Sequence, residues 1–191
     1  MASAGLVSFI HPLEYQKAVE NYCNSLAGAS LVCFVLQIKD RHNGNILIDL
    51  AGHIMHIDFG FLISNAPGKG LKFENAPFKL SEELVEVLGE QDSDNFKRFR
   101  HLMIDGFKAL HENADKIVLI VEMMMLGQSD LPCFAGGEPA LKALKDRLLP
   151  GGKRMDSSDC ARYVDGLIMA SYKNWRTKMY DDFQRCCQGI K

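Results

Sequence analysis

The chemistry that this sequence can perform is concentrated in two short stretches. Asp40-Arg41-His42-Asn43-Gly44-Asn45 comes first, and Asp58-Phe59-Gly60 follows. Carboxylate and amide oxygens are ligands that suit Mg²⁺, and Asp or His side chains can accept a proton. Transfer of a phosphoryl group from ATP needs these parts, a proton acceptor beside the attacking hydroxyl and ligands for the metal ions on the phosphates. The two stretches therefore predict phosphoryl transfer.

The residues between the two stretches are expected to bring them together. Two runs rich in Ile, 46–48 and 54–57, flank Leu50-Ala51-Gly52-His53, and Gly52 supplies the flexibility that a tight turn needs. A β-hairpin of these runs places Asn45 and Asp58 side by side at its open end. We therefore expect an amide and a carboxylate that can share a metal ion.

The spacing within the first stretch also matches a known catalytic pattern. In the protein-kinase pattern His-Arg-Asp-x-x-x-x-Asn, the catalytic Asp precedes the metal-binding Asn by five residues. Asp40 and Asn45 have this spacing, but here His42 follows the Asp. A purely structural alternative, in which Asp40 pairs with Arg41 and Asn45 caps a turn, leaves the spacing unexplained. Either Asp40 or His42 is the candidate for the proton acceptor, since a neutral His has a pKa of about 6.5 and a carboxyl one of about 3.9.

Mostly helical elements surround the predicted hairpin. The apolar spacing predicts a buried helix from Glu14 to about Gln37, in which Gly28 indicates the close approach of a neighbour. Residues 1–13 are expected to form an irregular leading segment, and Phe61 to Lys79 an irregular loop. Further helices are expected at 82–88 after Ser81, from Asp94 to about Leu110, from Asn113 to Gly127, from about Pro139 to Leu148, and from Ser157 or Ser158 to about Cys187 with a kink near Trp175.

Length and composition are those of one soluble domain spanning 1–191. The chain has 191 residues, of which 47% are apolar and 24% charged. A net charge of −2 gives no general attraction to nucleic acid, so no nucleic-acid partner is expected. The six cysteines form no Cys-x-x-Cys pair, which favours a reducing cytoplasm. We expect no signal peptide, and the longest apolar run, Leu31 to Leu36, is shorter than the roughly 20 residues that span a bilayer.

These motifs resemble the phosphatidylinositol 3- and 4-kinase family, and within it the type III beta phosphatidylinositol 4-kinases. The resemblance covers about residues 16–190, which correspond to the C-terminal lobe of the catalytic domain. It implies a mainly α (α+β) fold, a helical bundle with a small β-hairpin that carries the active-site loops. The resemblance is carried by the segments 39–49, 52–61, 78–80, 131–134 and 178–184.

The resemblance also implies a role for each site residue. Asp40 and His42 are the candidates for accepting the proton of the inositol hydroxyl, while Asn45 and Asp58 would hold the Mg²⁺ (or Mn²⁺) ions that bridge the phosphates of ATP. Arg41 would be a structural partner for a carboxylate.

Adenine and lipid would contact other parts of the chain. Leu47 and Ile57, facing inward from the hairpin, match the apolar floor beneath adenine, with ordinary core packing as the alternative. The loop from Phe61 to Phe78 corresponds to the activation loop that reads the lipid headgroup. Its sparse charge, with Lys69 and Lys72 as candidate substrate-binding residues, fits unphosphorylated phosphatidylinositol, although the two lysines also suit a merely solvated loop.

The sequence lacks the partner lobe that such a kinase needs. No Gly-rich loop lies upstream of Asp40, and neither Lys17 nor Lys39 has a strand-like context. We therefore expect little or no kinase activity from this polypeptide alone. The alternative is a non-catalytic fragment or isoform that binds a partner or a membrane. The C-terminal helix around Trp175 would contact the bilayer or pack on the domain, and the resemblance implies a cytoplasmic protein on the periphery of Golgi-type membranes.

Overall fold

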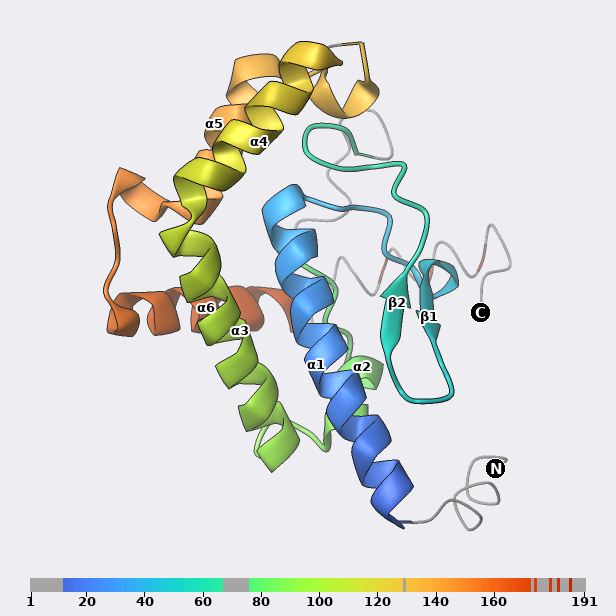
Figure 1. Cartoon of the computed structure of the whole chain (residues 1–191). Helices are drawn as coiled ribbons and strands as arrows, with labels where there is room; N and C mark the ends of the chain where they lie inside the picture. Colours follow the sequence, from blue (N-terminus) through green and yellow to red (C-terminus); the bar gives the residue numbers. More distant parts are fainter. Residues whose placement is uncertain are drawn as a thin grey trace.

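The computed structural model describes residues 12–66, 76–128 and 130–172, together with positions 174, 179, 182 and 186, and the statements below concern these residues. The chain is mostly helical with one small antiparallel sheet, which confirms the predicted fold class (Figure 1). Six α-helices are α1 Pro12–Leu36, α2 Glu82–Leu88, α3 Asp94–Glu112, α4 Ala114–Gly127, α5 Gly137–Leu148 and α6 Ser157–Ser171. The two strands are β1 Ile46–Ile48 and β2 Ile54–His56, and short 3₁₀ turns occupy Asn43–Asn45, Pro132–Phe134 and Pro150–Gly152.

The core is built around α1 and α3, which lie side by side with α6 crossing behind them (Figure 1). α1 is apolar on most of its faces because it packs against α3, α5 and β2 at once, and ten of its residues are buried. α3 is amphipathic and buries Phe99, Met103 and Phe107 completely. By length and composition alone α1 also passes as a candidate membrane span, but its packing is that of a core helix.

The close approach predicted at Gly28 occurs instead at another glycine. Gly28 is exposed, and a Cβ atom added there would meet nothing within 4 Å. A Cβ atom on Gly106 of α3 would lie 2.4 Å from Cδ1 of Leu31, so this glycine is the one that lets α3 approach α1. The prediction for Gly28 was therefore wrong, because an apolar helix does not reveal which of its faces meets a neighbour.

These two glycines give a stability prediction. Gly28→Ala should raise the free energy of unfolding by about 0.5–1 kcal/mol, since Ala is the better helix former and meets no obstacle. Gly106→Ala should leave the protein less stable than Gly28→Ala by about 1–3 kcal/mol, because the buried Leu31 side chain would have to move. Urea denaturation of both variants measures the difference; equal stabilities would contradict the packing described here.

The hairpin is fixed against α1 along its length. Gly52 has a φ of +91°, and a Cβ atom there would lie 2.3 Å from the carbonyl oxygen of Ala18, so no other residue fits this turn without displacement. Asn21 donates a hydrogen bond to the carbonyl of Ala51 (2.9 Å), and Ser25 Oγ accepts one from the backbone of Ile54 (2.9 Å). The turn predicted at Gly52 is confirmed, and α1 determines where the open end of the hairpin lies.

The last predicted helical region is interrupted after Ser171. α6 is capped by Asp156, whose side chain accepts from the backbone of Asp159, and it ends at Ser171. Tyr172 is extended and pairs in parallel with Leu80, and Ser171 Oγ accepts from the backbone of Phe78. This pairing with a distant segment ends α6 a few residues before the kink expected near Trp175, and the described positions 179, 182 and 186 beyond it are again helical. The leading residues 1–11 and Trp175 lie outside the described residues.

Candidate active site at the mouth of the hairpin

The hairpin brings the two predicted metal ligands to one place. Ile46 pairs with His56, and the backbone of Ile57 donates to the carbonyl of Asn45 (3.1 Å). Asn45 is therefore opposite Ile57, and Asp58 is the next residue along the chain. Both residues stand at the open end of the hairpin, as the sequence predicted. Whether they bind a metal ion stays a prediction.

Three side chains of the catalytic stretch converge beside this point. The Asn45 amide nitrogen donates to the carbonyl of Asp40 (2.9 Å) and lies 3.2 Å from His42 Nε2. His42 Nε2 in turn lies 3.8 Å from Asp40 Oδ1. Asp40 and Asp58 both have left-handed backbone conformations, with φ of +65° and +57°. Such conformations are uncommon for residues other than glycine and occur where the surrounding structure imposes them, often at functional sites.

These contacts use the side-chain nitrogen of Asn45 and not its side-chain oxygen. Because the amide nitrogen is the donor to Asp40, the side-chain oxygen Oδ1 is the atom left for a further ligand, and no hydrogen bond to it is found among the described residues. An amide oxygen and the exposed carboxylate of Asp58 form a donor set that fits a hard divalent cation such as Mg²⁺. Among the described residues, those of this site included, no group of three or more His, Cys, Asp or Glu side chains is placed to hold a metal.

Arg41 connects the two functional stretches. Its side chain is only 2% exposed, and its guanidinium donates to the carbonyls of Lys39 (2.9 Å), Ile57 (2.7 Å) and Asp58. It also lies over the ring of Phe59, 5.7 Å from the centroid. The predicted structural role of Arg41 agrees with this geometry, and the acceptors are main-chain carbonyls. The guanidinium thereby fixes the backbone of Asp58 relative to the catalytic loop.

The contact with Asn45 indicates which tautomer the neutral His42 ring adopts. The Asn45 amide is a donor, so His42 Nε2 accepts and the ring proton belongs on Nδ1 in the neutral form. Nδ1 is buried and has no hydrogen-bond partner within the described part of the chain. The Asp40 side chain, at 19% exposure, is the more accessible of the two candidate proton acceptors.

Leu47 and Ile57 lie on the outer face of the hairpin, which corrects the expectation that they point inward. Leu47 pairs with Met55, and by the period of two along a strand Ile57 shares their face. The three side chains are 44%, 45% and 41% exposed, so packing in the core is excluded for them. Met55 was missed, although its position two residues before Ile57 is the signal that places it here.

The opposite face of the hairpin carries a partly buried His–Cys contact. His56 Nδ1 lies 3.3 Å from the Cys33 Sγ of α1. Burial, together with the smaller effects of the nearby positive charges of Arg41 and Lys79, lowers the pKa of His56 to about 4. The imidazole is therefore neutral at pH 7 and serves as packing between α1 and the hairpin. The exposed His53 instead contacts Asp49, with Nδ1 2.9 Å from Oδ2.

The depressed pKa of His56 predicts a pH-dependent stability. In the unfolded chain His has a pKa of about 6.5, so below this pH the unfolded state binds the proton more readily and stability is lost as the pH falls from about 6.5 towards 4. At pH 5 the loss from this residue should be about 2 kcal/mol relative to pH 7.5. Urea denaturation at both pH values tests it: His56→Gln should remove most of that difference, and a variant with the full wild-type difference would contradict the assignment.

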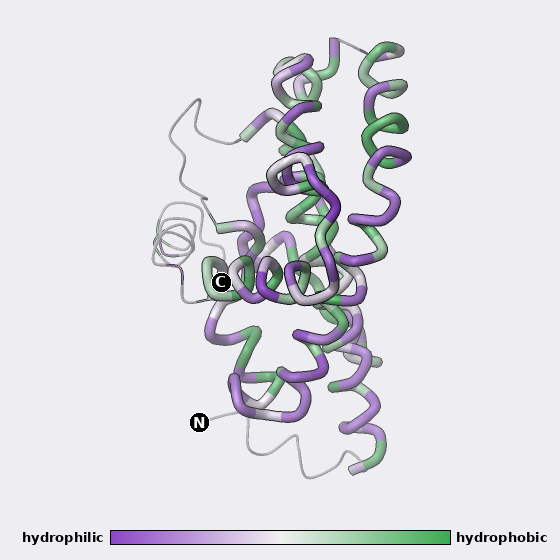
Figure 2. Tube along the Cα trace, turned by 90° about the vertical axis from the view of Figure 1, so that its left-hand side faces the viewer, coloured by the Kyte–Doolittle hydropathy of each residue, from purple (hydrophilic) through white to green (hydrophobic). Residues whose placement is uncertain are grey.

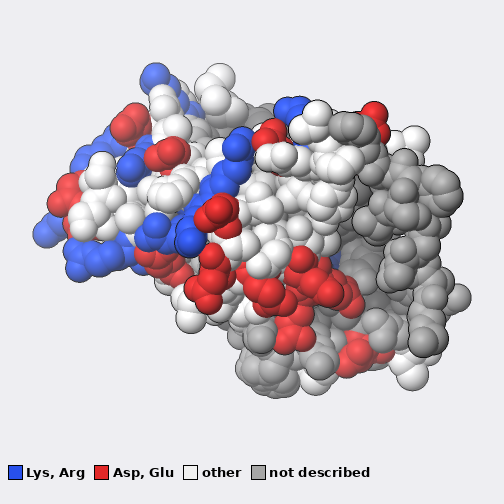
Figure 3. All heavy atoms as spheres, turned by 90° about the horizontal axis from the view of Figure 1, so that it is seen from below, with Lys and Arg blue, Asp and Glu red and all other residues white. Residues whose placement is uncertain are grey.

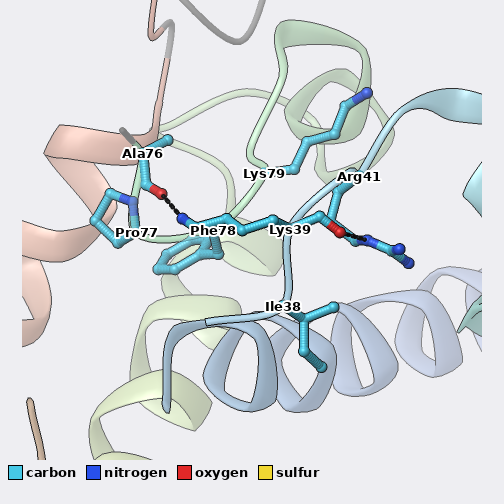
Figure 4. Close-up of a pocket in the computed structure, with 7 residues that line it drawn as sticks. All are labelled: Ile38, Lys39, Arg41, Ala76, Pro77, Phe78 and Lys79. Carbon is cyan, nitrogen blue, oxygen red and sulfur yellow. Dashed lines mark hydrogen bonds between the residues drawn. The ribbon is translucent and has the colours of Figure 1, made fainter. Parts of the chain in front are cut away.

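Two lysines hold the far end of the predicted substrate loop near the catalytic stretch. Lys39 Nζ donates to the carbonyl of Ala76 (3.4 Å), and Lys79 Nζ donates to Asn43 Oδ1 (2.9 Å). Figure 4 shows Lys39 extended along a small pocket towards Ala76, while the Lys79 side chain points away from that pocket. Lys69 and Lys72, the predicted substrate-binding residues, lie outside the described residues, so their role stays a prediction.

Comparison with known proteins agrees with the site. The family model described as phosphatidylinositol 3- and 4-kinase matches residues 7–134. The chain is 45% identical over 181 residues to phosphatidylinositol 4-kinase beta 2 of Arabidopsis thaliana, with 93% of this chain and 16% of the relative covered. It is 47% identical over 177 residues to phosphatidylinositol 4-kinase PIK1alpha of Candida albicans, with 92% and 18% covered. For phosphatidylinositol 4-kinase beta of Sorex araneus the identity is 43% over 176 residues, with 92% and 21% covered. The chain thus spans about a fifth of these relatives or less.

Proposed function

The chain belongs to the phosphatidylinositol 3- and 4-kinase family, and on that premise we propose that it forms the catalytic C-terminal lobe of a phosphatidylinositol 4-kinase. In this proposal the γ-phosphoryl group of ATP is transferred to the 4-hydroxyl of phosphatidylinositol. The observation that carries it is the convergence of Asp40, His42 and Asn45 beside Asp58 at one end of the hairpin. The 4-position is taken from the names of the relatives.

Asn45 and Asp58 would hold the metal ion in this proposal. Mg²⁺ bound to ATP neutralises the charge that develops on the phosphates during transfer. The contribution of the protein is to hold these two ligands in fixed positions. Asn45 Oδ1 is set by the bond from its amide nitrogen to Asp40, and the Asp58 backbone is held by Arg41. The ligands are therefore oriented by the fold before ATP arrives, which is how a protein contributes most to phosphoryl transfer.

Asp40 is the proton acceptor that the geometry favours. Its carboxylate is more exposed than the His42 ring, whose Nε2 already accepts from Asn45 and whose Nδ1 is buried. An accessible carboxylate can accept the hydrogen of the inositol hydroxyl as the oxygen attacks phosphorus. His42 then acts as a positioning residue that keeps Asn45 in place.

ATP and lipid would approach from the open side of the hairpin. The exposed side chains of Leu47, Met55 and Ile57 offer an apolar surface of the kind that adenine contacts, next to the metal ligands. Lys69 and Lys72 remain the proposed contacts to the headgroup. In the complete kinase, a partner lobe that carries the Gly-rich loop and its Lys would cover this apolar surface. The enzyme would work on the cytoplasmic side of Golgi-type membranes, where the C-terminal segment could also contact lipid.

A pair of assays tests the proposal. The purified chain is incubated with phosphatidylinositol, Mg²⁺ and labelled ATP, and little or no turnover is expected because the sequence contains no Gly-rich loop. The chain is also placed in Arabidopsis phosphatidylinositol 4-kinase beta 2 in exchange for the matched segment, and this chimera should form phosphatidylinositol 4-phosphate. A folded chimera that binds ATP but transfers no phosphate would support the alternative, a non-catalytic module that binds a partner or membrane.

A further inference from the structure

The solvent-facing side of α4 is made almost entirely of large apolar side chains. Of the whole helix only Ala114 and Val121 are buried. Five apolar residues of its C-terminal half are 54–77% exposed, and a sixth, in the connection that follows, is 43% exposed. We call this set the α4 apolar face: Leu119, Ile120, Met123, Met124, Leu126 and Leu131.

This composition is not that of an ordinary surface helix. Surface helices place polar residues opposite their buried stripe, whereas a helix that is apolar on all sides is usually covered. Between Ile117 and Gly127 the sole charged residue is Glu122, and it is half-buried rather than at the centre of the exposed side. Figure 2 shows α4 at the edge of the molecule, with apolar residues along much of its length. A contiguous exposed apolar surface of this kind marks a contact with a protein or a membrane.

The α4 apolar face adjoins the segment that leads into the predicted substrate loop. Ser64 Oγ donates to the carbonyl of Cys133 (2.7 Å) and accepts from the backbone of Gly136 (3.1 Å). These bonds tie residues 60–66 to the connection after α4, and Leu131 lies in that connection. In Figure 1 the C-terminal end of α4 and this segment occupy the same end of the molecule. A surface in contact with α4 therefore also lies close to the start of the substrate loop.

The charges of the molecule favour the same orientation. Residues 82–94 contain six acidic residues and no Lys or Arg, and they belong to α2 and the start of α3, at the other end of the molecule from α4 (Figure 1). Seen from that end, Figure 3 shows Asp and Glu gathered over the centre of the surface. Beside α4, the neighbouring α5 carries the exposed Lys142 and Lys145, which are balanced by the exposed Glu138 and Asp146. An anionic bilayer would therefore repel the acidic α2 end more strongly than the mixed-charge α4 end.

We propose that the α4 apolar face inserts into the interfacial region of a lipid bilayer and so brings residues 60–66, which lead into the substrate loop, close to the headgroups. The inference rests on the proposed function, because an enzyme acting on a membrane lipid must present its substrate loop to a bilayer. A bilayer is favoured over a protein partner because the face is aliphatic and thioether throughout. It lacks the Trp, Tyr and Arg that dominate the binding energy of protein interfaces.

Vesicle binding of the 191-residue chain tests the proposal. The chain is mixed with phosphatidylcholine vesicles, with and without phosphatidylinositol and without ATP, and its partition coefficient is measured by flotation. The triple variant Leu119→Asp, Met123→Asp, Leu126→Asp should lower the partition coefficient by at least about tenfold, because three carboxylates replace side chains that leave water. Circular dichroism should show unchanged helix content, since all three side chains are exposed.

The matched control is Met169→Asp on α6, where the side chain is 68% exposed and lies on a different element. It should leave the partition coefficient within about twofold of the wild type. A loss below tenfold in the triple variant, or an equal loss in the control, would overturn the proposal. The proposal would also be overturned if the wild-type chain did not bind vesicles but formed a dimer in sedimentation that the triple variant did not form. That result would show that the α4 apolar face is a protein–protein interface.

The same experiment separates this inference from the proposed function. If the chimera transfers no phosphate but the triple variant loses vesicle binding, the bilayer contact stands and the kinase assignment fails. If the chimera phosphorylates lipid dispersed in detergent while the triple variant still binds vesicles like the wild type, the kinase assignment stands and the bilayer contact fails.

Discussion

Asp40→Asn in the chimeric kinase should lower kcat by about 10²–10⁴-fold while leaving the affinity for Mg-ATP nearly unchanged. The amide keeps the size of the carboxylate but cannot accept the hydroxyl proton. The backbone carbonyl of Asp40, which accepts from Asn45, is unaffected by the substitution. The site should therefore stay assembled and still bind Mg-ATP, while the rate of phosphoryl transfer falls. Steady-state kinetics with phosphatidylinositol, together with ATP binding by calorimetry, measures both quantities.

His42→Gln is the variant that distinguishes the two candidate proton acceptors. The Gln side chain can retain an acceptor near Asn45, so the loss should be about tenfold, equivalent to one hydrogen bond of about 1–1.5 kcal/mol. If His42→Gln lost more activity than Asp40→Asn, the proton acceptor would be His42 and the assignment made from exposure would be wrong.

Arg41→Met should lower the free energy of unfolding by about 3–5 kcal/mol, because it removes a buried guanidinium that donates to three main-chain carbonyls. The guanidinium donates to Lys39, Ile57 and Asp58, so a side chain of similar length without donors loses all three bonds at once. The loop that carries Asp58 should also become mobile. Urea denaturation measures the free energy of unfolding, and hydrogen exchange of residues 57–60 measures the mobility of the loop.

Arg98→Met is the control for this prediction. Arg98 is exposed and bonds Asn24 at 3.3 Å, so its loss should change stability by no more than about 0.5 kcal/mol. Equal effects of the two substitutions would show that Arg41 is not the link between the catalytic loop and Asp58.

Local signals in the sequence were enough to predict most of the elements and the position of the site. α2 begins at Glu82 directly after Ser81, and Gly89 ends it with a φ of +86°. The pairing of the two Ile-rich runs follows from their composition and from the turn at Gly52, and it puts Asn45 beside Ile57. These features depend on residues close in sequence, which is why the sequence alone reveals them.

What the sequence could not predict depends on contacts between distant segments. α6 ends where Tyr172 pairs with Leu80, and no residue near Tyr172 in the sequence indicates this pairing. The two-residue period shows that Leu47 and Ile57 share a face, but only the packing of β2 on α1 decides that this face is exposed. Likewise the acceptors of Arg41 come from residues 39, 57 and 58, which meet only after the hairpin folds.

The measurement that tests the account most directly is where a divalent metal ion binds. Mn²⁺ takes the place of Mg²⁺ in such sites, and its unpaired electrons broaden the NMR signals of nearby nuclei. In the isotope-labelled chain with Mn²⁺ and ATP, we expect the signals of residues 40–45 and 57–60 to broaden first, and Asp58→Asn to abolish the effect. Broadening that is centred elsewhere, or that persists undiminished in Asp58→Asn, would show that the mouth of the hairpin is not the metal site and would contradict the kinase assignment.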